Sequence, residues 1–108
     1  MKRVIIESPY AGRVEANVRY ARRALRDSIS RGEAPIASHL LYTQPGILDD
    51  NDPVQRMLGI NCGLAWMDVA DLVVFYVDYG RSSGMLRAEV VATALGKNIV
   101  YREIGKTE

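Results

Sequence analysis

The sequence lacks the residues from which proteins build covalent cross-links and structural metal sites. It holds one cysteine and one histidine in 108 residues. Because a disulfide needs two cysteines and a structural zinc site needs four Cys or His ligands, neither is expected within this chain. A lone cysteine, here Cys62, is typical of a reducing compartment. We therefore expect a cytoplasmic protein that binds no metal.

Charge and hydropathy show no marked bias either. Lysine and arginine total 14 against 13 aspartate and glutamate residues, so the net charge indicates no class of partner. No apolar run approaches the roughly 20 residues of a membrane span, and Met1 leads into a predicted strand rather than a signal peptide. Among the arginines of the first predicted helix there is a single aromatic side chain, Tyr20, whereas a nucleic-acid platform would require several interleaved with them. We expect neither a membrane nor a nucleic-acid polymer as partner.

Two common phosphate-binding fingerprints are also missing. The chain has no Walker A lysine motif and no GxGxxG turn. Neither nucleoside triphosphate hydrolysis nor dinucleotide redox chemistry is therefore indicated, and no cofactor is expected.

The sequence does contain a regular alternation of strand and helix signals. An unbroken apolar run at 72–77 is typical of a strand that is covered on both faces. Other strand-like segments lie at 3–7, 35–38 and 98–101, and helical patterns follow the turn at 8–12, cover 53–69 and follow the Ser-Gly loop at 82–84. Alternating strands and helices predict a parallel sheet with right-handed connections. We expect residues 1–108 to form a single flavodoxin/Rossmann-like three-layer α/β domain with four to five parallel strands, in the order 2-1-3-4.

Periodicity predicts the buried faces of the later helices. The helix at 53–69 should begin with Asp52 as N-cap, Pro53 at the first position and Gln55 as its capping-box partner. Its predicted buried residues are Val54, Met57, Leu58, Leu64 and Ala65, and those of the following helix are the row Leu86, Val90 and Ala94. The segment at 39–52 is predicted to be a loop without secondary structure, and such loops are often functional.

Two features predict self-association. A domain of this size gains useful burial from an oligomer. Gly59 and Gly63 each weaken their helix by about 1 kcal/mol relative to alanine, which the close approach of a partner's backbone would offset. We expect a homodimer or higher homo-oligomer, with Trp66 near the interface.

A ligand crevice is predicted where the carboxyl ends of the strands meet the amino ends of the helices. Three segments converge there, and their candidate substrate-binding residues are Ser8, Tyr10, Gly12, Arg13, His39, Ser82, Ser83, Gly84 and Met85. His39 is either a satisfied hydrogen-bonding residue at a strand end or a ligand contact. The helix amino end at 82–84, assisted by Arg13 or Arg81, is a candidate site for a phosphate.

Glu89 lies at the margin of the apolar stripe of its helix, about one turn from the amino end. The helix dipole favours a carboxylate near this end. Two interpretations stay open: a solvated surface glutamate, or a nucleophile that faces the crevice.

Three stretches together resemble a known superfamily. These are PYAG after the first strand, ADLVVFYVD, and SSGMLRAEVVATALGK. They look like the nucleoside 2-deoxyribosyltransferase-like superfamily, which includes nucleoside deoxyribosyltransferases and deoxynucleoside monophosphate N-glycosidases. The resemblance covers nearly the whole chain and is strongest to small domains of phages and bacteria, so it implies a bacterial cell or a phage-infected host.

The resemblance also implies roles for individual residues. In these enzymes a glutamate after a Ser-Gly loop attacks the anomeric carbon of the sugar, and the matching residue here is Glu89. The loop holds the sugar or its 5′-phosphate, which implies this role for 82–84. Cleavage of an N-glycosidic bond also needs a group that helps the base to leave, and Asp78 is the candidate.

The implied function is cleavage or base exchange at the N-glycosidic bond of a small-molecule nucleoside or nucleotide. Two other functions remain open. One is a non-catalytic binding module that holds a nucleotide or a nucleotide-derived signal in the same crevice. The other is an interaction subunit, which only Trp66 and the glycine-bearing helix indicate.

Overall fold

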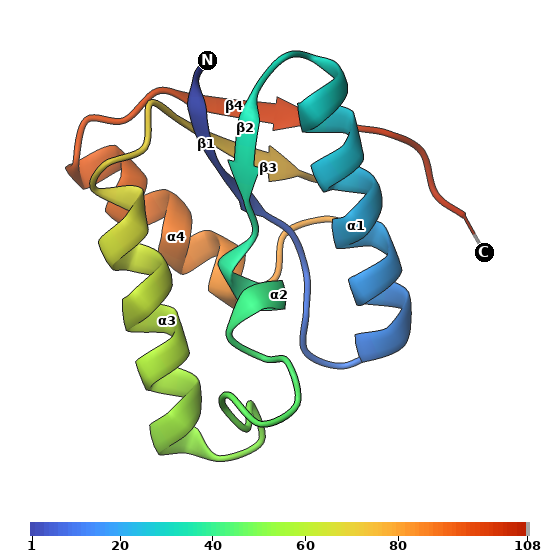
Figure 1. Ribbon diagram of the computed structural model, residues 1–108, viewed down its shortest axis with the longest axis vertical. Coiled ribbons are helices and arrows are strands. Elements are labelled where there is room, and N and C mark those ends of the chain that lie inside the picture. Colours follow the sequence, from blue (N-terminus) through green and yellow to red (C-terminus); the bar gives the residue numbers. More distant parts are fainter. Residues whose placement is uncertain (108) are drawn as a thin grey trace.

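A parallel sheet of four short strands forms the centre of the protein, as described by a computed structural model for residues 1–107 (Figure 1). The strands are β1 (Arg3–Glu7), β2 (Ala34–Ile36), β3 (Leu72–Tyr76) and β4 (Ile99–Arg102). Their order is β2-β1-β3-β4 and every neighbouring pair is parallel. The predicted α/β class and strand order are therefore confirmed.

Helices cover both faces of this sheet. They are α1 (Val14–Ser30), α2 (Ser38–Leu41), α3 (Pro53–Met67) and α4 (Ser83–Ala94). The long helix α1 lies on one face, while α3 and α4 lie side by side on the other (Figure 1). No helix within residues 1–107 has both the length and the apolar character needed to cross a membrane.

Side chains of β1 and β3 alternate between two separate cores. Val4, Ile6, Val74 and Tyr76 pack with Tyr20 of α1 and the residues around it. Ile5, Val73 and Phe75 pack instead with residues of α3 and α4, including Met67 and Met85. Because successive strand residues point to opposite faces, this alternation also decides on which side of the sheet the residues at the strand ends lie.

The segment predicted as a loop at 39–52 is partly helical, so that prediction is wrong. β2 ends at Ile36 rather than at Ser38, and Ser38 begins the short helix α2. α2 packs against α3 at Gly63, where an added Cβ would lie only 2.5 Å from Ser38 Oγ. Gly63 thus permits a close approach within the chain, and it does not serve a partner subunit as its sequence position suggested.

The start of α3 agrees with the prediction in position but not in hydrogen bonding. Asp52 is the N-cap residue and Pro53 begins the helix, yet the Asp52 side chain makes no capping hydrogen bond. Gln55 does not complete a capping box. Its Oε1 accepts a hydrogen bond from Asp49 N at 2.8 Å, which ties the preceding loop to the helix.

The predicted buried faces of α3 and α4 are wrong for most residues. α4 buries Met85, Ala88 and Ala92 rather than the row of Leu86, Val90 and Ala94. In α3 the fully buried residues are Gly63 and Met67. The outer surface of the two helices carries exposed apolar side chains, which we call the outer apolar face: Val54, Met57, Leu58, Trp66, Leu86, Val90 and Leu95. Both helices are apolar on two sides, so periodicity could not identify the buried one.

Candidate functional site

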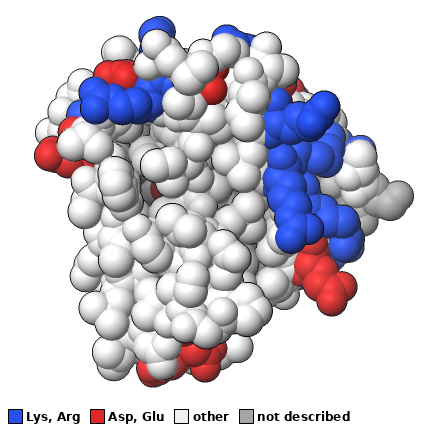
Figure 2. All heavy atoms as spheres, viewed as in Figure 1, with Lys and Arg blue, Asp and Glu red and all other residues white. Residues whose placement is uncertain are grey.

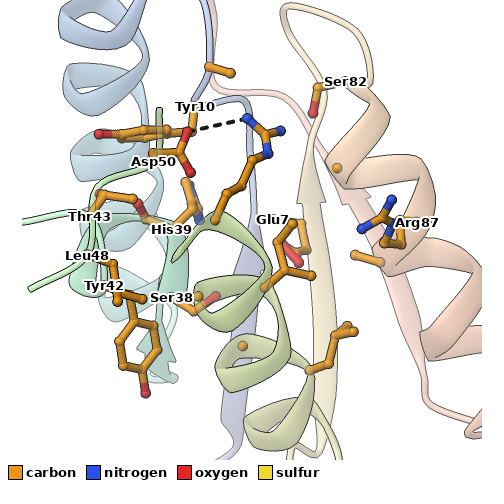
Figure 3. Close-up of a pocket in the computed structure, with 18 of the residues that line it drawn as sticks. Glu7, Tyr10, Ser38, His39, Tyr42, Thr43, Leu48, Asp50, Ser82 and Arg87 are labelled. Atoms are coloured by element: carbon orange, nitrogen blue, oxygen red, sulfur yellow. Dashed lines mark hydrogen bonds and ion pairs between the residues drawn. The ribbon is translucent and has the colours of Figure 1, made fainter. Parts of the chain in front are cut away.

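A pocket with a cavity volume of about 150 Å³ opens at the carboxyl end of β1 (Figure 3). Its walls come from the segment after β1, from α2 and the loop that follows it, from α3, and from the amino-terminal half of α4. This is the edge of the sheet at which open α/β folds bind ligands. The predicted crevice therefore exists.

Several residues predicted from the sequence lie together on the walls of this pocket. They are Ser8, Tyr10, His39, Ser82, Ser83 and Gly84. The three predicted segments thus converge even though they are far apart in the chain. Figure 3 shows Tyr10, His39 and Ser82 around the same opening.

Glu7, which was not predicted, lies between His39 and Arg87 in the pocket (Figure 3). It is the last residue of β1 and shares the side of Ile5, so alternation turns it toward α3 and α4. No hydrogen-bond or ion-pair partner for its carboxyl group exists among residues 1–107. Burial raises the pKa of Glu7 to about 8. The carboxyl group is therefore largely protonated at neutral pH.

His39 is joined to the residue after Glu7. Its Nε2 and Ser8 Oγ lie 2.7 Å apart in a hydrogen bond, and Ser8 itself is buried. His39 Nδ1 is buried and has no protein partner among the described residues. Burial lowers the pKa of His39 to about 4, so the imidazole is neutral at physiological pH.

The amino end of α4 forms a polar part of the wall. Ser82 is the N-cap, and its Oγ accepts a hydrogen bond from Met85 N at 3.3 Å. The N–H groups of Ser83 and Gly84 occupy the first two helical positions, which have no acceptor within a helix. Two arginines outside the predicted set also line the pocket. Arg87 comes from α4, and Arg56 pairs with Asp50 at 3.3 Å, the dashed line in Figure 3.

Asp78 lies on the other side of the sheet, so its predicted role near a leaving base does not agree with the structure. It follows β3 on the side of Val74 and Tyr76. Its carboxylate accepts hydrogen bonds from Tyr20 OH at 2.6 Å, Ile104 N at 2.9 Å and Gly105 N at 2.7 Å. Although burial raises the pKa of Asp78, these hydrogen bonds outweigh it and hold the pKa below its usual value.

Glu89 does not line the pocket, which corrects the placement that the resemblance implied. Its carboxylate pairs with Arg81 Nη1 at 2.5 Å and accepts a hydrogen bond from Tyr101 OH of β4. The preceding residue, Ala88, is the one that lines the pocket. One helical position corresponds to about 100° of rotation, so Glu89 and Arg81 form an ion pair beside β4, away from the cavity.

Three other predicted residues also lie outside the pocket wall. Gly12 has φ of +94° in the exposed turn before α1, where its role is conformational. Arg13 is the exposed N-cap residue of α1. Met85 is 2% exposed and packs in the core beneath α4.

Comparison with known proteins identifies a family for this arrangement. Residues 2–102 match the family described as Domain of unknown function (DUF7768). The chain belongs to this family. No curated protein matches its sequence.

The DUF7768 chain shares its fold with solved 2-deoxyribosyltransferases. The enzyme from Leishmania mexicana has a TM-score of 0.66 and 14% identity, over 97% of this chain and 66% of that one. The enzyme from the psychrotolerant bacterium Bacillus psychrosaccharolyticus has a TM-score of 0.66 and 17% identity, over 98% of this chain and 76% of that one. The predicted nucleoside 2-deoxyribosyltransferase-like fold is confirmed, and the chain is shorter than both enzymes.

The DUF7768 pocket combines three chemical capacities. Glu7 offers a carboxyl group that can give up a proton near neutral pH. Ser83, Gly84 and Arg87 offer donors to an anion. The rest of the wall includes apolar and aromatic side chains such as Tyr10, Ile60 and Leu64, suited to the flat face of a ring. The sequence signal for Glu7 was its position at a strand end, whereas no pattern distinguished Arg56 or Arg87.

Proposed function

We propose that the protein binds a nucleoside or nucleotide in this pocket and cleaves or exchanges its N-glycosidic bond. One observation supports this most directly. A carboxyl group without a protein partner, Glu7, shares a pocket with the amino end of α4, in a fold found in 2-deoxyribosyltransferases. In most enzymes that cleave glycosidic bonds through an oxocarbenium-like transition state, carboxyl groups lie beside the sugar.

The amino end of α4 is the proposed position for a 5′-phosphate. Free N–H groups at a helix start attract anions through hydrogen bonds and the helix dipole. Ser83 and Gly84 supply these groups, and Arg87 follows one turn later on the same wall. Arg87 thus takes the place that the sequence suggested for Arg13 or Arg81.

Base release from nucleosides and nucleoside 5′-monophosphates tests this function. Incubation of the purified protein with each compound, followed by chromatographic separation of free bases, is expected to show release from at least one of them. Calorimetry should give tighter binding for a monophosphate than for the matching nucleoside. Equal affinities would contradict the phosphate position, and an absence of release from the whole panel would contradict the enzymatic function.

A second candidate is a binding module that holds a nucleotide without cleaving it. The position of Glu89 favours this alternative, because the residue that the resemblance makes the nucleophile is engaged by Arg81 and Tyr101 outside the pocket. A binding module would bind a monophosphate in calorimetry and release no base over long incubation.

We further propose that a second copy of the chain covers the outer apolar face. The face lies on two neighbouring helices, and its members Val90 and Val54 are 70% and 69% exposed. Exposed apolar side chains on adjacent elements are typical of an interface. Figure 2 shows few charged side chains over α3 and the loop beside it, in agreement with this assignment.

A further inference from the structure

Glu7 has a position and an environment that no other carboxylate among residues 1–107 shares. Glu7 is the last residue of β1 and lies on the same side of the sheet as Ile5. On this side the core between the sheet and the helices α3 and α4 ends, and the pocket begins. Among residues 1–107, the only buried side-chain polar atom without a partner is His39 Nδ1. Since the Glu7 oxygens also have no partner, they are not enclosed by protein, and they open into the cavity.

The other titratable side chains on the pocket wall do not offer the same chemistry. From α2, His39 is neutral because burial lowers its pKa to about 4. From the loop before α3, Asp50 is held by Arg56. α4 contributes Arg87, a permanent cation, and the remaining groups are the hydroxyls of Tyr10 and Tyr42. Only Glu7 combines access to the ligand, a raised affinity for a proton and the absence of a competing partner.

The side of the pocket formed by α4 offers no carboxyl group that could replace Glu7. α4 places Ala88 on the pocket, a side chain that carries no functional group. The nearest carboxylate on that helix, Glu89, pairs with Arg81 at 2.5 Å on the side of β4. The carboxyl group that serves the pocket therefore comes from the first strand.

We propose that Glu7 is the general acid of the reaction and protonates the leaving base. This inference rests on the proposed function. The bond between the anomeric carbon and the base nitrogen breaks, and its electron pair stays on the base, which takes the Glu7 proton. Water then adds to the anomeric carbon and gives one proton to the Glu7 carboxylate, so the carboxyl group is regenerated. The products are the free base and the sugar or sugar phosphate.

The pH dependence distinguishes this role from a structural one. A general acid must be protonated in the free enzyme, so kcat/KM is expected to fall as the pH rises through about 8, the pKa that burial gives Glu7. Glu7→Gln keeps the shape and the neutral state but cannot donate a carboxyl proton. Its base release should drop by roughly 10²–10⁴-fold, the range typical of a lost general acid, and the alkaline decline should disappear.

The experiment compares five proteins on nucleosides and nucleoside 5′-monophosphates: wild type, Glu7→Gln, Glu7→Asp, Glu89→Gln and Glu15→Gln. Glu15 is exposed on α1 and does not line the pocket, so Glu15→Gln is a matched control for loss of one carboxylate. Glu7→Asp retains an acid with a shorter reach and should recover part of the activity. Circular dichroism and monophosphate binding by calorimetry verify that Glu7→Gln is folded and has an intact pocket.

The possible failures are distinguishable. Base release that survives Glu7→Gln overturns the role of Glu7 and leaves the proposed function standing. If Glu89→Gln loses base release while Glu7→Gln keeps it, Glu89 of α4 is the catalytic carboxylate and the role of Glu7 is overturned. A wild type that binds a monophosphate but releases no base overturns the proposed function and the general-acid role together.

Discussion

The two faces of the sheet differ in how their polar side chains are paired. On the α1 face, Asp78 accepts three hydrogen bonds, and Arg102 forms two 2.8 Å contacts with Glu33. Tyr76 OH donates to Asp27 beside them. On the α3/α4 face, Glu7 has no partner among residues 1–107, and neither does His39 Nδ1. Polar groups are therefore satisfied within the protein on one side of the sheet and available to a ligand on the other.

This difference separates stability from function. Polar groups that are paired within the protein contribute to folding, whereas buried groups left without a partner cost free energy. His39 Nδ1 is such a buried group, and burial also disfavours the charged form of Glu7. Both residues line a cavity, where a ligand can supply the missing partners. Side chains alternate between the two faces along β1 and β3, and this alternation decides whether a residue at a strand end is paired within the protein or faces the pocket.

The outer surfaces of the two helical layers differ as well. Exposed arginines, among them Arg19, Arg22 and Arg26, lie on the outside of α1, where Figure 2 shows basic side chains gathered. The outside of α3 and α4 is the outer apolar face. The outside of α1 is typical of a surface exposed to solvent, whereas the outer apolar face is typical of a surface that contacts another protein.

The largest effect is expected from breaking the ion pair on the α1 face. Side chains of Arg102 and Glu33 are 10% and 12% exposed, and removing one partner of such a pair typically costs about 3–5 kcal/mol. Glu33→Gln should lower the free energy of unfolding in urea by an amount near 3 kcal/mol. Asp71→Asn is the control, because Asp71 and Arg3 form a solvent-exposed pair that water screens, so its loss should change stability far less than the loss of Glu33.

The same pair gives a pH dependence with a definite sign. The hydrogen bond from Arg102 holds the pKa of Glu33 below its usual value. A depressed carboxyl pKa adds stability above the unfolded-state pKa, and this stability is lost as the pH falls through the folded-state pKa. Wild type should therefore lose more stability than Glu33→Gln on acidification from pH 5. An equal loss would show that the pair contributes nothing.

Asp78→Ala is expected to have the next largest effect. It leaves Tyr20 OH and the N–H groups of Ile104 and Gly105 without their acceptor, and unpaired groups of this kind cost about 1–3 kcal/mol. Chemical denaturation should show a loss near the upper end of this range, and the binding of nucleoside monophosphates should persist. Loss of binding with unchanged stability would instead assign Asp78 to the pocket.

On the α3/α4 face, removing a carboxyl group should increase stability. Burial raises the pKa of Glu7 to about 8 from 4.5. The unfolded chain therefore releases this proton at a lower pH than the folded one, and wild-type stability falls as the pH rises from 4.5 to 8. Glu7→Gln removes this penalty and should be more stable than wild type at pH 9, with a higher free energy of unfolding in urea. A less stable Glu7→Gln would mean that the carboxylate has a partner in solution.

The smallest effect concerns the outer surfaces. Val90→Asp places a charge on the outer apolar face at a position that is 70% exposed, so the fold of a single chain should be unaffected. Sedimentation should show self-association weakened by at least about tenfold, or ~1.4 kcal/mol. Arg22→Glu on the outside of α1 is the control and should leave association unchanged. A wild type that is monomeric at micromolar concentration would remove the proposed dimer.

The fold could be predicted from the sequence because its signals were mutually consistent. The apolar run at 72–77 and the short segments around it permitted only a parallel sheet with crossover helices, and β3 is buried throughout as expected. Errors arose where the pattern was ambiguous. α3 and α4 carry apolar residues on two sides, and their sequences do not indicate which side meets the sheet.

The site was predictable only in part, for a related reason. Strand ends and helix starts located the crevice, and the segments around Ser8, His39 and Ser82 converge as predicted. Choosing among the carboxylates required knowing which face of the sheet opens to solvent. Alternation puts Glu7 and Asp78 on opposite faces, but the sequence does not show which face holds the cavity. The rotation of α4 that presents Ala88 rather than Glu89 is likewise a property of tertiary packing.

The hydrogen bond between Trp66 Nε1 and Tyr42 OH, 2.8 Å long, connects the outer surface of α3 to the wall of the pocket. Trp66 is the only tryptophan in the chain. Its fluorescence is therefore a signal from a single, known position, and the indole donates to Tyr42, a residue that lines the pocket. Occupancy of the pocket is expected to change this emission, so affinities can be followed optically without a label.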